Sequence, residues 1–394
     1  MSNETMKVLH WSDAHLGKQQ YSFMQRLLDF AGVLNQIADI AIREQVDLVV
    51  DTGDTFDSPE PDPESVKAYR IFCEKLADSH IPYISISGNH DFHETGCWAA
   101  AISRYVQRPI SKEGDKPIVS WYDNKDKTTG ISVVVSDWMP SDKIREFLTK
   151  FRVTRYDEAQ EGPVDLLILH QSCSLFLPKA AAPKAEVTGE MLEGLGRYVA
   201  IGDTHISETI SLKDGTLVGS AGSTEYTRGE ESLEKFVNLI TFGSQPKPVV
   251  KAIPLKTRKV VRKDIYTDVD LQVLMAEVRE LLAAGVNPMV CIKYAPIMER
   301  EIRIVQENLA DSLPMFRATS MTTVSEDENY STGRLEFVTE MTDIVCELLK
   351  DHPELHQTAV DLWKNPKNVG EITRSLLQQI RIKLQPQQAP AASI

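Results

Sequence analysis

Short apolar runs that end in polar clusters dominate the first half of this chain. Six runs of four or five residues, mostly rich in Val and Ile, have the length and composition of buried strands. They span residues 8–11, 48–51, 83–87, 132–135, 166–169 and 198–201. Five clusters of Asp, His and Asn follow such runs: Ser12-Asp13-Ala14-His15, Gly53-Asp54-Thr55-Phe56-Asp57, Gly88-Asn89-His90-Asp91, His170-Gln171 and Gly202-Asp203-Thr204-His205.

Amphipathic stretches alternate with these strands. The apolar residues of the first stretch recur at the spacing of one buried helix face; they are Leu27, Phe30, Leu34, Ile37 and Ala41. A second helix is expected over about residues 64–77. Such alternation predicts a layered α/β domain over residues 1–254.

The pattern changes after residue 254. Alternating strands and helices at 260–266, 271–283, 289–294, 299–309 and 316–324 predict a small α/β domain over residues 255–324. A polar, acidic linker is expected over 325–334, followed by helical segments within 335–384. The last residues, 385–394, are rich in Gln, Pro and Ala, which is typical of a disordered tail.

The bulk composition sets limits on function. A net charge of -14 counts mildly against a free-standing nucleic-acid binder, although a local basic groove remains compatible with it. The five cysteines are scattered and form no Cys-x-x-Cys pair, a pattern typical of reduced thiols. No apolar run approaches the roughly 20 residues that span a bilayer. We therefore expect a cytoplasmic protein with no membrane partner.

The five polar clusters indicate a metal site. Open α/β sheets place their ligand crevice at the carboxyl ends of strands, and Asp, His and Asn bind divalent ions. Taken singly, each cluster has an ordinary explanation, such as a helix cap, a turn or a buried structural histidine. The five in this order, each after a strand, favour the metal site.

In order, the clusters resemble the motifs of the calcineurin-like metallophosphoesterases, which implies an α/β sandwich. The sequence follows Asp-x-His, Gly-Asp-x-x-Asp, Gly-Asn-His-Asp and a lone His, but its last motif reads Gly-Asp-Thr-His instead of Gly-His-x-His. Within this family, the sequence resembles the branch of SbcD-type DNA repair nucleases. Residues 26–30, the run Gly222-Ser223-Thr224-Glu225 and the small α/β domain match it too, so the resemblance spans roughly residues 6–320.

The resemblance implies the roles of individual residues. One ion would be held by Asp13, His15, Asp54 and His205, and a second by Asp54, Asn89, His170 and Asp203. His90 would donate a proton to the leaving oxygen, and Asp57 would orient His90. The implied ions are two Mn²⁺, with Mg²⁺ as an alternative, and the mixed nitrogen and oxygen ligands suit Mn²⁺.

Asp203 departs from the family pattern, which has His at this position. Three carboxylates against two divalent ions would leave about one net positive charge, and hence a less acidic bridging water. We expect a slower or alkaline-shifted enzyme; the alternative is that Asp203 is a neutral substitution.

A basic run near the start of the small domain could follow a DNA backbone or form a solvated surface. It contains Lys256, Arg258, Lys259, Arg262 and Lys263, and Arg228 is a further candidate for DNA contact. An apolar stripe in the C-terminal helical region, with Leu335, Val338, Met341, Ile344 and Leu348, could pack on its own protein. As the resemblance implies, it could instead bind the coiled coil of an SMC-like ATPase (SbcC type). A homodimer is also expected.

Three functions fit these observations. The leading one is a Mn²⁺-dependent DNA exonuclease and endonuclease that acts at DNA ends with the ATPase. The second is a phosphodiesterase of a small nucleotide, although such a substrate requires neither the small domain nor the C-terminal helices. The third is a mainly architectural subunit with a weakened metal site.

Overall fold

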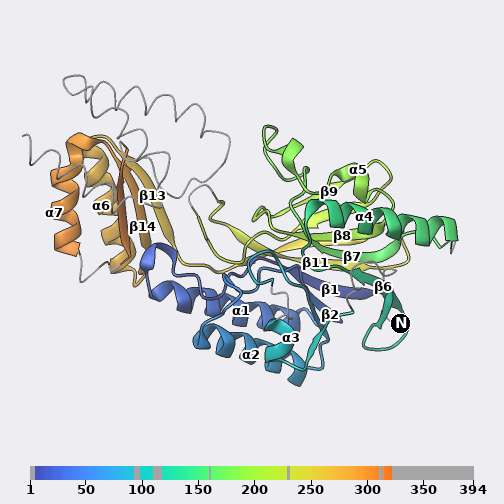
Figure 1. The fold of residues 1–394 in the computed structure, drawn as a ribbon. Helices are drawn as coiled ribbons and strands as arrows, with labels where there is room; N and C mark the ends of the chain where they lie inside the picture. The colour runs from blue at the N-terminus through green and yellow to red at the C-terminus, as the bar shows by residue number, and fades with distance from the viewer. Residues whose placement is uncertain are drawn as a thin grey trace, which may run out of the picture. The chain divides into compact units, whose positions relative to one another are not determined.

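The computed structural model describes residues 5–92, 98–109, 118–158, 161–228, 231–309, 313 and 315–321 (Figure 1). The chain divides into two units, Met1–Thr322 and Thr323–Ile394, and every described residue belongs to the first. The expected linker over 325–334, the helical region 335–384 and the tail 385–394 lie outside the described residues. No described helix has the length and apolar character needed to cross a membrane.

The first of two six-stranded sheets has the order β12-β11-β1-β2-β3-β4. Strands β1 to β4 run parallel, and β11 and β12 join the β1 side in antiparallel pairs. Their bounds are β1 Met6–Trp11, β2 Leu48–Asp51, β3 Tyr83–Ser85, β4 Val106–Gln107, β11 Lys235–Phe242 and β12 Val249–Leu255.

The second sheet has the order β5-β6-β7-β8-β10-β9. Its four central strands run parallel, and the edge strands β5 and β9 are antiparallel to their neighbours. The bounds are β5 Ser120–Asp123, β6 Gly130–Val135, β7 Val164–His170, β8 Gly196–Gly202, β9 Glu208–Ser211 and β10 Leu217–Ser220.

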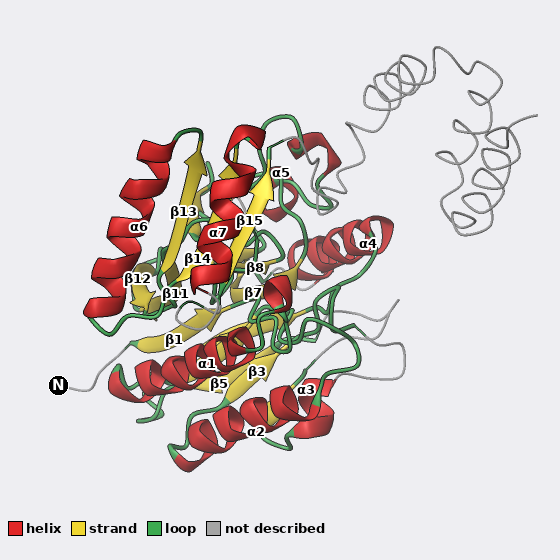
Figure 2. Cartoon of the chain, turned by 90° about the vertical axis from the view of Figure 1, so that its left-hand side faces the viewer, coloured by secondary structure: helices red, strands yellow, loops and turns green. Residues whose placement is uncertain are grey.

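The two sheets face each other across a shared core. Side chains from β1, β2 and β3 pack there against side chains from β6, β7 and β8, as Val8, Val50 and Leu166 illustrate. Helices α1 (Gln25–Arg43), α2 (Pro63–Asp78) and the short α3 (Trp98–Ile102) lie on the side of the first sheet. Helices α4 (Ser141–Arg152) and α5 (Gly189–Leu192) cover the second (Figure 2). The expected α/β sandwich is confirmed.

The part of the chain predicted as a small domain has a three-stranded parallel sheet, formed by β13 (Val260–Ile265), β14 (Met289–Tyr294) and β15 (Phe316–Ser320). Helices α6 (Asp268–Ala283) and α7 (Glu299–Leu309) pack on it around Leu274 and Ile292. Thr267 and Asp270 form a capping box that starts α6. The predicted alternation of strands and helices in this domain is confirmed.

The remaining short turns of helix are η1 (Gln20–Ser22), η2 (Val153–Glu158), η3 (Ala182–Lys184) and η4 (Pro296–Met298). Strands β4, β5, β9, β10 and β11 and helix α4 were not anticipated from the sequence. Several of these strands, such as β9 with the sequence ETIS, are short and partly polar, so they carry no clear apolar run.

A buried cluster of charged residues connects α1 to the start of the small domain. Arg26 is fully buried and its guanidinium reaches Asp29 (2.7 Å), the Tyr226 carbonyl (2.8 Å) and Glu225 (3.4 Å). Arg258 binds the same Asp29 through Nε and Nη2, at 2.5 and 2.6 Å. Two guanidinium groups thus share one carboxylate, which ties the small domain to the first helix.

Replacing Arg26 with Met should lower the free energy of unfolding by about 3–5 kcal/mol, because Glu225 would remain buried without its cation. The matched control on the same helix is Arg43→Met, since Arg43 is 59% exposed and pairs with Glu44 at the surface. It should change the free energy by less than about 0.5 kcal/mol. Urea unfolding measures both, and equally small effects would contradict the buried-pair account.

Candidate active site

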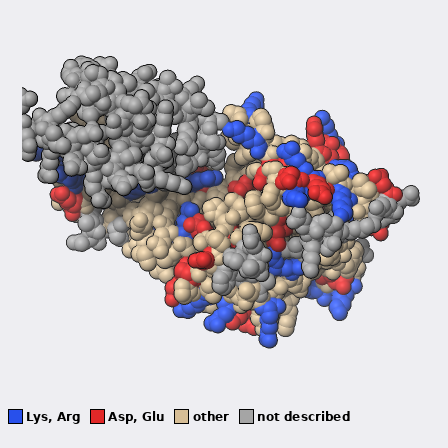
Figure 3. All heavy atoms as spheres, viewed as in Figure 1, with Lys and Arg blue, Asp and Glu red and all other residues tan. Residues whose placement is uncertain are grey.

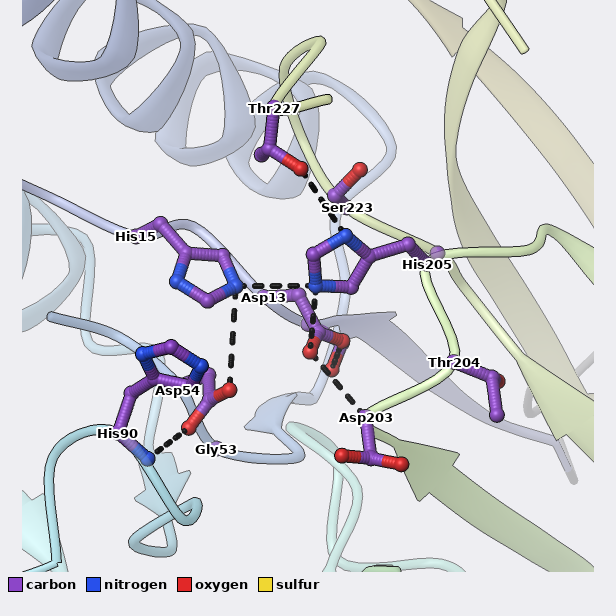
Figure 4. Close-up of polar contacts among 12 residues, drawn as sticks. Asp13, His15, Gly53, Asp54, His90, Asp203, Thr204, His205, Ser223 and Thr227 are labelled. Atoms are coloured by element: carbon purple, nitrogen blue, oxygen red, sulfur yellow. Dashed lines mark hydrogen bonds and ion pairs between the residues drawn. The ribbon is translucent and has the colours of Figure 1, made fainter. Parts of the chain in front are cut away.

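The five predicted clusters come together where β1, β2, β3, β7 and β8 end. Figure 4 shows residues from the loops that follow β1, β2, β3 and β8. The first two loops are joined by backbone hydrogen bonds, from the N–H of Asp13 to the carbonyl of Gly53 (3.0 Å) and from His15 to the carbonyl of Asp54 (2.9 Å). Parallel strands from both sheets therefore bring their carboxyl ends to one edge of the sandwich, as expected for an α/β crevice.

The backbone is strained at this edge. Five non-glycine residues of the clusters have positive φ angles: Asp13 (52°), His15 (45°), Asp54 (53°), Asp203 (84°) and His205 (50°). L-residues rarely adopt this conformation, and such residues gather at functional sites where the surrounding fold holds them.

Gly88 allows the second and third loops to approach each other. A Cβ at this position would lie 2.0 Å from Oδ1 of Asp54, which no side chain could accommodate. The approach lets the backbone N–H of His90 donate to the same Oδ1 at 2.9 Å. One oxygen of Asp54 is therefore held by backbone, and the other is free to face the crevice.

Two imidazoles face each other across the first donor group, which consists of Asp13, His15 and His205. Nδ1 of His15 donates to Asp57 (3.0 Å) and Nδ1 of His205 donates to Glu231 (2.5 Å), because a carboxylate can only accept. Burial lowers the pKa of His15, which favours its neutral ring. The Nε2 atoms lie 3.0 Å apart, so their lone pairs converge on a place suited to a cation.

A second donor group contains Asp54 and His170, and Asp13 also lies within reach of it. His170 donates from Nδ1 to the carbonyl of Thr52 (2.6 Å), and its Nε2 lies 3.0 Å from Oδ1 of Asn89. Burial alone would lower the pKa of His170, but the charge and hydrogen bond of Asp54 raise it well above the ordinary value. This pocket therefore also favours a positive charge beside Nε2.

Asp54 lies between the two groups. Its Oδ2 is 3.8 Å from Nε2 of His15 and 3.5 Å from Nε2 of His170. One carboxylate in this position can bridge two divalent ions about 3.5–4 Å apart. The nitrogen and oxygen donors thus fit a site for two metal ions.

Residues 6–171 match the family described as calcineurin-like phosphoesterase. These residues form a calcineurin-like phosphoesterase domain. The match contains four of the five clusters and ends before Asp203 and His205.

The phosphoesterase is similar to archaeal proteins named DNA double-strand break repair protein Mre11. It is 29% identical over 276 residues to that of Saccharolobus solfataricus, which covers 66% of this chain and 69% of the relative. It is 28% identical over 362 residues to that of Sulfolobus acidocaldarius, covering 88% and 90%. It is 29% identical over 285 residues to that of Sulfurisphaera tokodaii, covering 70% and 68%.

Asp203 of the phosphoesterase differs from the other expected ligands. Its N–H donates to Asp13 (3.1 Å), and burial raises its pKa to about 6. Among the described residues, its carboxylate belongs to none of the three groups whose ligand atoms lie within 4.8 Å of one another. In Figure 4 it points away from the pair formed by His15 and His205. An aspartate is shorter than the family's histidine, so its oxygens stop further from the crevice.

The Asp57 carboxylate does not orient His90 as expected from the sequence. It binds His15 and, at 2.8 Å, the ammonium of Lys18. His90 instead places Nδ1 3.4 Å from the backbone carbonyl of Asp57, and its ring meets that of His15 edge-on at 4.9 Å. His90 is exposed at the mouth of the crevice, within reach of Asp54.

Two carboxylates that matter to the site were not anticipated from the sequence. Glu231 binds His205 and follows the Gly-Ser-Thr element within a polar loop, where it carries no motif. Asp51 ends β2 and accepts hydrogen bonds from Gly53 (2.9 Å), Ser85 (3.0 Å) and Tyr83 (3.1 Å). Asp51 thereby fixes the loop that presents Asp54. The one sequence feature that could have indicated this role is its position at the end of an apolar strand.

The candidate DNA contacts of the basic run are not equivalent. Arg258 is engaged by Asp29, Arg262 lies over the ring of Tyr226, and Lys263 pairs with Glu277. Lys256, Lys259 and Arg228 are exposed, although Arg228 lies 3.8 Å from Glu231. On the face in Figure 3, basic and acidic side chains intermingle. DNA contact by these residues stays a prediction.

The stability of the phosphoesterase should fall with pH because of Asp51. Burial raises the pKa of Asp51 to about 7, whereas an unfolded aspartate titrates near pH 3.9. Between these values only the folded state holds the proton, so each pH unit lowers stability by up to about 1.4 kcal/mol. Asp51→Asn should make this slope shallower in urea unfolding between about pH 5 and 7.

The control is Asp39→Asn, because Asp39 is exposed and pairs with Lys75 at the surface. Asp39→Asn should have the same dependence of the free energy of unfolding on pH as the unchanged protein. Equal slopes for both variants would contradict the role assigned to buried Asp51.

Proposed function

We propose that this phosphoesterase is a DNA double-strand break repair nuclease that hydrolyses phosphodiester bonds at DNA ends. The observation that carries the proposal is the Asp54 carboxylate between two sets of converging donors. The archaeal relatives named as repair proteins support DNA as the substrate, since one of them matches 88% of this chain.

The residues divide the chemistry among them. Asp13, His15, Asp54 and His205 would hold one ion, and Asp54, Asn89 and His170 the other. Two bound divalent ions lower the pKa of a shared water and offset the charge that develops on the phosphoryl oxygens. Asp54 would contribute to both ion sites in a fixed orientation, because its other oxygen is held by the His90 N–H.

His90 is proposed as the general acid. Donation from Nδ1 to the Asp57 carbonyl leaves Nε2 of the exposed ring to protonate the leaving oxygen. Imidazole suits this step because its ordinary pKa lies near neutrality.

Mn²⁺ is the proposed ion, because imidazole and oxygen donors are mixed at both positions. The proposed partners are DNA, a second copy of this chain and a coiled-coil ATPase of the SMC type. They rest on the resemblance to the SbcD-type nucleases.

The experiment that tests the substrate compares linear DNA, a cyclic dinucleotide and a chromogenic diester, each with Mn²⁺. We expect cleavage of linear DNA and of the chromogenic diester, and no cleavage of the dinucleotide. Asp54→Ala should lower both activities by at least about 1000-fold, because it removes the shared ligand. If the protein cleaves the dinucleotide in preference to DNA, the substrate is a small nucleotide and not DNA. If no substrate is cleaved in a way that depends on Asp54, the protein is an architectural subunit.

Asp203→His should raise the rate of diester cleavage near neutral pH by about tenfold, since it adds a longer, neutral ligand at the second ion. The rate against pH, measured with Mn²⁺, should also shift to lower pH. A neighbouring control is Glu208→Gln, because Glu208 is exposed. An unchanged rate in Asp203→His would mean that Asp203 is a neutral substitution.

A further inference from the structure

The two proposed ion sites differ in what lies behind their imidazoles. The first ion site is defined by His15 and His205, and the second by His170 and Asn89. Asp54 lies between both sites and Asp13 is near both, so the shared carboxylates do not distinguish them. The groups that bind the Nδ1 atoms do.

The buried carboxylate of Glu231 lies behind His205, and both of its oxygens accept hydrogen bonds. Oε1 of Glu231 accepts from Nδ1 of His205 at 2.5 Å. Oε2 accepts from Lys235 (2.8 Å), from the Ser223 hydroxyl (3.2 Å) and from the backbone N–H of Thr227 (3.0 Å). Three donors therefore fix one oxygen, while the other accepts from His205 and from the Thr227 hydroxyl.

Behind His15 stands a second carboxylate that also pairs with a lysine, here through the same oxygen, Oδ1, that faces the histidine. Asp57 accepts from Nδ1 of His15 at 3.0 Å and from the ammonium of Lys18 at 2.8 Å. Both imidazoles of the first ion site thus rest on an anion that is held by a lysine. A carboxylate behind an imidazole fixes its tautomer and makes Nε2 a stronger metal ligand.

Behind His170 stands a neutral group. Its Nδ1 donates to the backbone carbonyl of Thr52 at 2.6 Å. The neighbouring donor Asn89 is itself uncharged. A carbonyl orients the ring but adds no negative charge, so this imidazole is the weaker ligand.

We propose that Glu231, held by Lys235, is a positioning residue that makes the first ion site the tighter of the two. The first ion site then fills at low metal concentration and keeps its ion. The second ion site fills only at higher concentration, and its ion exchanges. This inference rests on the two-cation chemistry of the proposed function and assigns the order in which the ions bind.

The test is a titration of the full chain with Mn²⁺ in the absence of DNA. Binding is measured by calorimetry and by the electron paramagnetic resonance signal of free Mn²⁺. We expect two steps whose affinities differ by at least about tenfold. Glu231→Gln should weaken the tighter step by about 10–100-fold and leave the weaker step unchanged. Glu231→Asp, which keeps the charge on a shorter side chain, should lie between the two.

The matched control is Glu234→Gln, because Glu234 is exposed in the same segment and should leave both steps unchanged. Asp57→Asn tests the same idea from the other imidazole, in case Glu231→Gln fails to fold. It should also weaken the tighter step alone. Unfolding in chelator shows whether each variant is folded before metal is added.

Two equal steps in the unchanged protein, or a loss confined to the weaker step in Glu231→Gln, would overturn the inference and leave the nuclease proposal standing. An absence of Mn²⁺ binding would overturn both. Loss of the tighter step in both folded variants, with the weaker step retained, supports the inference.

Discussion

The Asp54 carboxylate is the interaction on which the rest of the site depends. One oxygen accepts the His90 N–H, and the other lies between His15 and His170. This position requires Gly88, because any Cβ there would collide with the same carboxylate. Asp51 stabilises this arrangement, because its carboxylate accepts a hydrogen bond from the Gly53 N–H in the loop that presents Asp54. A single short side chain thus couples loops that come from different strands.

The histidines of the site are defined as much by what holds them as by what they face. Each directs Nε2 inward because Nδ1 is engaged, by Asp57, by Glu231 or by the Thr52 carbonyl. The lone pairs then converge in a way that only a positive charge relieves. The positive φ angles at five cluster residues show that the fold holds these loops in a costly conformation for that purpose.

Much of this architecture could be predicted from local sequence. Strand β2 and strand β14 were predicted with their observed bounds, because apolar β-branched runs bounded by polar residues leave little ambiguity. The small domain followed from the same periodicities. Strands such as β9 and β10 could not be predicted, because their pairing, and not their own composition, makes them strands. The same limit explains why the Asp57 carboxylate was expected beside His90 and is found beside His15, while His90 meets the Asp57 carbonyl.

The sequence by itself determined which donors exist and which strands they follow, since residue type and hydrophobic period are local properties. Only the tertiary structure decided which carboxylate stands behind which imidazole. Glu231 is 26 residues from His205 and Asp57 is 42 from His15, and such pairings depend on how separate loops are packed. The position of Asp203 was decided in the same way, since its type was plain from the sequence but its reach depends on where the backbone lies. Hydrogen bonds require atoms to meet within about 3 Å, and packing alone sets that distance.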